Sequence, residues 1–318
     1  MDVVLLFPGQ GSQKPGMGKD LVAAFPAAAD VFRQADEALG EPLSTLCFEG
    51  PADTLTLTHN AQPALLAHGA AVWAVTRDAL GDAVRAAAGH SLGEFTAYCA
   101  TGALAVPDAI RLVRQRGTLM YESGLARPGA MAAILGDTTR TIDEICVEAS
   151  ASPEGGLVVP ANYNSPGQVV VSGEVASVER AMELSKQAGA KRAIRLPVSG
   201  AFHSPLMQSA WQAFAQTLSH APIMDPSVPV YANVNAEPVT RATDARRLLL
   251  EQLTAPVRWI QVVENLVRDF PGALFVEMGP GSVLTGLVKK IAPGAECVAC
   301  GTPAEVETLL SRTSRATS

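Results

Sequence analysis

The chain has 318 residues, of which 48% are hydrophobic and 17% are charged. This composition allows a large buried core and excludes a disordered protein. The net charge is −7 and no run is rich in Lys or Arg, so nucleic acid is not expected as a partner. Residues 1–7 carry an acid instead of a basic leader region, and no apolar run reaches the length of a membrane span. We therefore expect a cytoplasmic protein that does not bind a membrane.

Short apolar runs alternate with helical patterns along most of the chain, which indicates an α/β fold with a mostly parallel sheet. Strands are predicted at 3–7, 84–88, 228–232 and 273–277. Helices are predicted at 19–38, 62–80, 91–102, 107–123, 203–218, 245–253, 260–268 and 283–291. The polar end of the chain, 311–318, is predicted to fray.

A different order of elements interrupts this alternation after residue 125. Strands are predicted at 130–135, 157–162, 168–172 and 192–197, and helices at 139–149 and 175–188. The order β-α-β-β-α-β is typical of a ferredoxin-like unit. We therefore expect a large α/β core made of 1–125 and 197–318, with a small α+β domain inserted at 126–196. A cleft between the two would be the natural ligand site.

The five cysteines are scattered and odd in number, so a disulfide framework is not expected. Cys297 and Cys300 have the spacing of a redox or zinc motif, but a second pair and a nearby histidine are missing. We interpret them as small buried residues on a late strand and expect no structural metal.

The segment Gly89–Gly93 reads Gly-x-Ser-x-Gly between a predicted strand and a predicted helix. This arrangement places Ser91 on a sharp strand-to-helix turn with its hydroxyl exposed, as in a nucleophile elbow. The alternative is a glycine-rich turn capped by serine. Serine is a poor nucleophile unless a neighbouring base accepts its proton.

Among five histidines, His203 is the preferred base because its loop follows the small domain and would border the cleft. His90 should point away from Ser91, since neighbouring side chains on an extended segment alternate. His59 and His68 fall in or near an upstream helix, and His220 caps a helix end. No acidic third member is evident: Asp108, Asp137 and Asp143 lie at helix starts or in the small domain. A carbonyl or amide is therefore expected to orient the histidine.

Arg116 falls on the apolar face of the helix at 107–123, as judged from a rotation of about 100° per residue. A buried guanidinium needs acceptors, so either a structural ion pair or a site for a substrate carboxylate is expected. The first predicted strand ends in a glycine-flanked glutamine, Gln10. Its backbone N–H, together with that of Leu92, suits the stabilisation of an oxyanion.

Together these motifs resemble malonyl-CoA:acyl-carrier-protein transacylases and the acyltransferase domains of polyketide synthases. The resemblance covers nearly the whole chain. The matching segments are 7–13, 62–65, 89–94, 116–117, 129–133, 162–168, 202–203, 256–259 and 277–281.

The resemblance implies a hydrolase-like core with a ferredoxin-like insert, and ping-pong transfer of malonyl from CoA to the phosphopantetheine thiol of an acyl carrier protein. In this family Ser91 would carry the acyl group, His203 would be the base, and Arg116 would bind the malonyl carboxylate. The remaining expected site residues are Gln10 and Leu92 at the oxyanion, Gln62, Asn162 and Phe202 around the acyl group, and Gln252, whose carbonyl would orient the histidine. No cofactor beyond the two substrates is implied, and a monomer is expected.

Three alternatives remain open. The first is a free-standing acyltransferase of a polyketide assembly line that uses malonyl or a modified extender unit, although Phe202 before the histidine favours malonyl. The second is an editing enzyme that hydrolyses acyl thioesters. The third is a silent carrier-docking protein, in which Ser91 or His203 would be expected to be lost. For carrier docking, the basic residues of interest are Lys186, Lys191, Arg192, Arg195, Lys289 and Lys290, which could equally be solvated surface charges.

Overall fold

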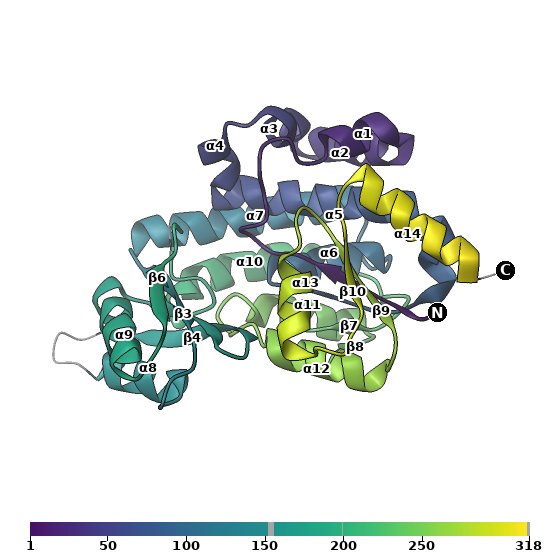
Figure 1. Cartoon of the computed structure of the whole chain (residues 1–318). Helices are drawn as coiled ribbons and strands as arrows, with labels where there is room; N and C mark the ends of the chain where they lie inside the picture. Colours follow the sequence, from purple (N-terminus) through teal and green to yellow (C-terminus); the bar gives the residue numbers. More distant parts are fainter. Residues whose placement is uncertain (152–155, 199, 317–318) are drawn as a thin grey trace.

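The computed structural model describes residues 1–151, 156–198 and 200–316, and two sheets organise the chain (Figure 1). The larger sheet has six strands in the order β10-β9-β1-β2-β7-β8, parallel throughout except at the edge strand β8. The smaller sheet has four antiparallel strands in the order β4-β5-β3-β6. The predicted fold class, a mostly parallel α/β core with a small α+β insert, is confirmed.

The large sheet consists of β1 (Val3–Phe7), β2 (Val84–Gly89), β7 (Val230–Tyr231), β8 (Pro238–Val239), β9 (Leu274–Met278) and β10 (Cys297–Cys300). The small sheet consists of β3 (Ala130–Leu135), β4 (Val158–Ser165), β5 (Gln168–Gly173) and β6 (Arg192–Arg195). The helices before the small sheet are α1 (Lys19–Ala24), α2 (Pro26–Leu39), α3 (Leu43–Glu49), α4 (Ala52–Thr56), α5 (Thr58–Leu80), α6 (Leu92–Ala100) and α7 (Val106–Ala126). Those within or after it are α8 (Ile142–Ser150), α9 (Val175–Gln187), α10 (Gln208–His220), α11 (Ala242–Glu251), α12 (Trp259–Asp269), α13 (Val283–Ile291) and α14 (Pro303–Ala316). Short 3₁₀ turns are η1 (Gly81–Ala83) and η2 (Pro205–Met207).

Strand β1 shows how the large sheet is buried on both faces. Leu5 and Phe7 belong to the hydrophobic cluster that includes α5, α6 and α7. Val4 and Leu6 belong to the cluster that includes α12 and α13. Because successive side chains of a strand point to opposite faces, helices must cover both sides of this sheet. This two-sided burial accounts for the uninterrupted apolar run at the start of the chain.

We call β3 to β6 with α8 and α9 the small unit; it lies at the left of Figure 1. It has its own hydrophobic core, which includes Ile134, Ile145 and Val178. Its strand order is that of a ferredoxin-like sheet. The main chain also joins it to the core, because Tyr163 N donates to Val257 O (2.9 Å) and Val257 N donates to Ala161 O (2.8 Å). These elements lie within 126–196, whose domain boundaries stay a prediction.

Two predictions about helices are wrong. The predicted helix at 19–38 is two helices, because Phe25 adopts an extended conformation before Pro26. Proline lacks an N–H and disfavours a helical conformation in the residue before it. The tail does not fray from residue 311, since α14 continues to Ala316; residues 317–318 lie outside the described part. Helices α3, α4 and α14 were not predicted.

Three boundaries differ near the predicted site. Helix α10 begins at Gln208, so His203 precedes it instead of starting it. Helix α11 ends at Glu251, so Gln252 caps the helix end. The predicted strand at 228–232 shortens to β7, and β8 pairs antiparallel with it. The second of these changes leaves the carbonyl of Gln252 free to face His203.

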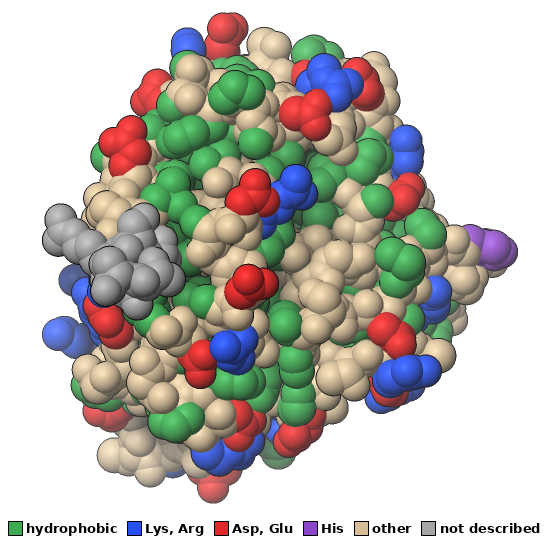
Figure 2. Space-filling view, turned by 90° about the vertical axis from the view of Figure 1, so that its right-hand side faces the viewer, with side chains coloured by type: hydrophobic (Ala, Val, Ile, Leu, Met, Phe, Trp, Pro, Cys, Tyr) green, Lys and Arg blue, Asp and Glu red, His purple; other side chains and the backbone are tan. Residues whose placement is uncertain are grey.

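Cys297 and Cys300 lie on β10, both buried and both free thiols, as predicted. Within the described ranges, no group of three or more His, Cys, Asp or Glu side chains is arranged to hold a metal ion. None of the described helices combines the length and the apolar character that a bilayer crossing requires. On the face shown in Figure 2, acidic and basic side chains are interspersed with hydrophobic ones.

Candidate active site

Ser91 lies in the turn between β2 and α6, with φ of 50° and ψ of −106°. Such a backbone conformation is strained for a residue with a side chain and is common at active sites. A Cβ on Gly89 would lie 1.9 Å from the carbonyl carbon of Gly93, and a Cβ on Gly93 would lie 2.0 Å from the carbonyl oxygen of Phe7. Only glycine fits at these two positions, and the tight turn that results presents the serine hydroxyl at the carboxyl edge of the sheet.

His203 contacts this hydroxyl, with Nε2 at 2.8 Å from Ser91 Oγ. Its other ring nitrogen, Nδ1, lies 2.8 Å from the carbonyl oxygen of Gln252. A carbonyl oxygen only accepts, so the proton is on Nδ1 and the lone pair of Nε2 faces the serine. A backbone carbonyl thus occupies the position that an acid has in a Ser-His-Asp triad.

The environment keeps His203 neutral. Burial, and then the positive charge of Arg116, lower the pKa of His203 to about 3. At neutral pH the ring is therefore able to accept a proton from Ser91. Its backbone φ of 56° is a second strained conformation at this site.

The other candidates for the base and the acid are engaged elsewhere. His90 Nε2 lies 2.7 Å from Asn164 Oδ1, and the ring packs 5.6 Å from that of Trp259. Asp108 pairs with a neighbouring arginine, Asp143 accepts a hydrogen bond from a tyrosine, and Asp137 lines a separate cavity. His220 lies in the last turn of α10.

Arg116 is a buried cation, with only 1% of its surface exposed. Nη1 donates to Gln62 Oε1 at 2.8 Å, and Nη2 donates to Gln252 Oε1 at 2.8 Å and to Ser91 Oγ at 3.2 Å. Burial lowers the pKa of Arg116 to about 10, so the side chain is still charged at neutral pH. Among the described residues no carboxylate forms an ion pair with it. Neutral acceptors therefore hold a positive charge beside the serine.

A cavity of about 450 Å³ opens at this point between the core and the small unit. Core and small-unit residues both line it, with Met131 on β3 and Asn162 on β4 from the small unit. Of the residues predicted from the sequence, the cavity brings together Gln10, Gln62, Ser91, Leu92, Arg116, Asn162, Phe202 and His203. The predicted cleft is present.

Gln252, whose carbonyl was expected to orient the histidine, lies behind the cavity. It is fully buried and is not part of the cavity wall. Its carbonyl faces His203 and its side chain faces Arg116, so it contacts the site from behind.

The two predicted oxyanion donors lie at the cavity. Leu92 is the first residue of α6, so its N–H has no acceptor within the helix, and a helix N-terminus favours a negative charge. Ser91 N is already used, since it donates to Asn233 Oδ1 at 2.6 Å. Gln10 is half-buried in the turn that follows β1.

Two residues of the site were missed. Asn233 bridges the serine turn, accepting from Ser91 N and donating to Gly89 O at 2.7 Å. Its place just beyond β7 could have been used to predict it from the sequence, because functional groups gather at the carboxyl ends of parallel strands. Glu94, known from the sequence only as part of the serine motif, is fully buried, and burial raises its pKa to about 7.

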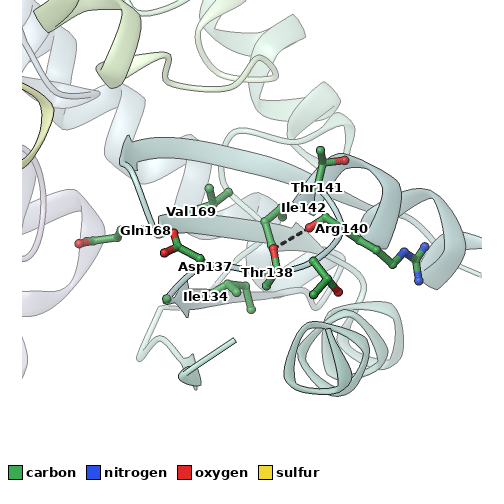
Figure 3. Close-up of a pocket in the computed structure, with 11 residues that line it drawn as sticks. Ile134, Asp137, Thr138, Arg140, Thr141, Ile142, Gln168 and Val169 are labelled. Carbon is green, nitrogen blue, oxygen red and sulfur yellow. Dashed lines mark hydrogen bonds between the residues drawn. The ribbon is translucent and has the colours of Figure 1, made fainter. Parts of the chain in front are cut away.

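A second cavity, of about 310 Å³, lies in the small unit between the end of β3 and the start of α8 (Figure 3). Thr138 Oγ1 donates to Arg140 O at 2.6 Å there, and the Arg140 guanidinium extends away from the other labelled side chains. That guanidinium pairs with Glu148 at 2.6 Å. This cavity shares no lining residue with the first.

The basic residues considered for carrier docking lie mostly on the small unit. Lys186, Lys191 and Arg192 are exposed there. Arg195 is exposed as well and pairs with Glu179 at 3.1 Å.

The comparisons with known proteins agree with this geometry. The acyl transferase domain family matches residues 4–315. The malonyl CoA-acyl carrier protein transacylase of Bacillus subtilis is 46% identical over 305 residues, which are 96% of this chain and 95% of that protein. The acyl-carrier-protein S-malonyltransferase of Bartonella henselae superposes with a TM-score of 0.93 at 43% identity, covering 99% of this chain and 100% of that one. A malonyl-transacylase solved in complex with its type II PKS acyl-carrier protein gives a TM-score of 0.93 at 41% identity, covering 98% and 100%. The chain therefore belongs to the acyl transferase domain family.

Proposed function

We propose that this chain transfers a malonyl group from coenzyme A to the phosphopantetheine thiol of an acyl carrier protein. The observation that carries the proposal is the buried Arg116 cation, 3.2 Å from the Ser91 hydroxyl and held by neutral partners. A malonyl thioester has a free carboxylate two carbons from the reacting carbonyl. With that carbonyl at Ser91, the carboxylate reaches the guanidinium, which binds carboxylates with directed N–H donors.

In the first half-reaction, Ser91 Oγ attacks the thioester carbonyl while His203 Nε2 accepts the hydroxyl proton. The developing oxyanion accepts hydrogen bonds from the backbone N–H groups of Gln10 and Leu92. The C–S bond then breaks, and the proton on His203 goes to the leaving thiolate of coenzyme A. The product is a malonyl ester of Ser91.

The second half-reaction runs through the same groups. The phosphopantetheine thiol of the carrier gives its proton to His203 and attacks the ester carbonyl. The C–O bond to Ser91 breaks, and the serine oxygen recovers the proton from His203. The carrier leaves with the malonyl thioester.

Two relatives support this pair of substrates. One is named for malonyl CoA and an acyl carrier protein, and the other was solved in complex with a type II PKS acyl-carrier protein. Side chains and main-chain groups of the protein and the two thiols supply every step of the two half-reactions, so no cofactor is part of the proposal. The proposal also includes the expectation from the sequence that the protein is a monomer in the cytoplasm.

The proposal is tested by the mass of the intact protein after incubation with malonyl-CoA, methylmalonyl-CoA or acetyl-CoA. We expect a malonyl adduct that the Ser91→Ala variant does not form and that a phosphopantetheinylated carrier removes. An adduct on Ser91→Ala would place the nucleophile elsewhere. An adduct that water removes as fast as the carrier does would favour the editing enzyme. Carriers of fatty-acid and of polyketide synthesis, offered side by side, separate the two pathways.

A further inference from the structure

A buried carboxylate that takes no part in the two half-reactions lies beneath the serine turn. Glu94, on the first turn of α6, is fully buried. Its Oε2 accepts from Gln252 Nε2 at 2.7 Å and from Asn233 N at 3.1 Å. Its Oε1 has no hydrogen-bond partner in the described part of the chain. Burying a carboxylate is costly unless hydrogen bonds compensate for the lost water. The two hydrogen bonds that Glu94 does accept come from Gln252 and Asn233, which both contact the active site from behind.

The amide of Gln252 faces partners of opposite kinds at its two ends. Nε2 lies among three acceptors: Glu94 Oε2, the carbonyl of Ser91 at 3.0 Å, and Asn233 Oδ1 at 3.5 Å. Oε1 accepts from Arg116 Nη2 at 2.8 Å. A flip of the amide would set its NH₂ against the guanidinium and its oxygen against three acceptors. The carboxyl oxygen of Glu94 makes the shortest of these contacts with Nε2.

We infer that Glu94 is a positioning residue that holds the amide of Gln252 in this orientation and thereby directs the Arg116 guanidinium toward the carboxylate of the acyl group. The inference rests on the proposed function and adds a determinant of acyl selectivity to it. Gln252 also holds His203 through its carbonyl, so one residue positions both the base and the cation.

Replacing the acceptor should change selectivity more than turnover of a neutral acyl group. In Glu94→Leu the amide loses its shortest contact, and kcat/KM for self-acylation by malonyl-CoA should fall roughly 3- to 100-fold, the range for losing a hydrogen bond to a neutral or a charged group. Acylation by acetyl-CoA, which does not use the guanidinium, should fall much less. Glu94→Gln keeps an oxygen for Gln252 Nε2 and should restore most of the malonyl preference.

Glu277 provides a matched control. It is also fully buried, and it accepts from the backbone N–H groups of Leu284 at 3.0 Å and Thr285 at 2.7 Å at the start of α13. Glu277→Leu should lower the Tm and leave the malonyl-to-acetyl ratio at the wild-type value.

Gln252→Met keeps the proposal testable if Glu94→Leu does not fold. This variant removes both ends of the amide and retains the carbonyl that faces His203. It should lower the malonyl-to-acetyl ratio as Glu94→Leu does, and the double variant should lower it no further than either single one.

An unchanged ratio in Glu94→Leu or in Gln252→Met, or equal losses with both acyl groups, would overturn the inference. So would a Glu94→Gln variant with the low ratio of Glu94→Leu. Failure of the wild-type protein to take up malonyl would instead refute the proposed function, and the two failures are distinct.

Discussion

Removal of the Arg116 guanidinium tests the link between structure and acyl selectivity, and the structure gives its magnitude. A guanidinium has five N–H donors. Gln62, Gln252 and Ser91 take three of them, which leaves one N–H on Nη1 and the N–H of Nε, which is buried without a partner in the described part of the chain. One or two hydrogen bonds to an acyl carboxylate, at about 1.5–3 kcal/mol each, contribute about 1.5–6 kcal/mol. Their loss corresponds to roughly a 10- to 10⁴-fold lower kcat/KM for malonyl-CoA.

Arg116→Met is the variant of choice, since it removes the charge and keeps an apolar chain near Phe95, whose ring centre lies 5.4 Å from the guanidinium carbon. Self-acylation by malonyl-CoA and by acetyl-CoA is followed by mass spectrometry of quenched samples. Malonyl transfer should fall by the factor above. Acetyl transfer should hold or rise, because a neutral acyl group no longer leaves a buried cation unpaired.

Arg114→Met is the matched control, two residues earlier on α7. Its guanidinium contacts Asn60 at 2.6 Å and also Glu41, away from the serine. The malonyl-to-acetyl ratio should not change in this variant. If the ratio in Arg116→Met also stays within about twofold of the wild type, where even one lost hydrogen bond to a charged group predicts a change of about tenfold, the reasoning is refuted and the cation is structural.

Three further predictions concern the base, its pKa and the carrier. His203→Ala should slow malonyl acylation by roughly 10²- to 10⁴-fold in quenched-flow mass spectrometry, and a near-wild-type rate would sink this assignment of the base. Because burial, and then Arg116, lower the pKa of His203 to about 3, the base stays neutral and acylation should keep its rate as the pH falls from about 8 to about 5. In Arg116→Met the loss of activity in acid should move to higher pH, whereas a wild-type loss centred near the ordinary value of 6.5 would contradict the argument. Charge reversal at both Lys186 and Lys191, exposed on the small unit, should raise the KM for the carrier in a salt-dependent way and leave self-acylation unchanged. Arg77→Glu, near the far end of α5, is the control, and equal effects on both half-reactions would show that this surface does not bind the carrier.

The features that the sequence predicted well depend on local patterns. The α/β class follows from apolar periodicity, and the serine turn follows from two glycines four residues apart, which the close approach at Gly89 and Gly93 requires. The apolar face of α7 placed Arg116 inside the protein, where it is found. The break before Pro26 was missed, although proline disfavours a helical residue before it and the signal was present in the sequence.

The hydrogen bonds behind the site could not be predicted in this way. Glu94 and Gln252 are 158 residues apart in the chain, and Glu94 and Asn233 are 139 apart. Their contacts exist because β2 and β7 are neighbours in the sheet and α11 ends beside them. No periodicity contains this information, and the carboxyl-end rule for parallel strands would have pointed only to Asn233.

The main-chain hydrogen bonds between β4 and Val257 affect how this protein can be recombined with its relatives. An exchange of 126–196 alone would leave Val257 paired with a foreign strand, a few residues after the carbonyl that holds His203. A misfit there would disturb the general base before any substrate had been bound. Chimeras built to change acyl preference should therefore carry 256–258 together with the insert, because the strand pairing of the insert extends to residues outside 126–196.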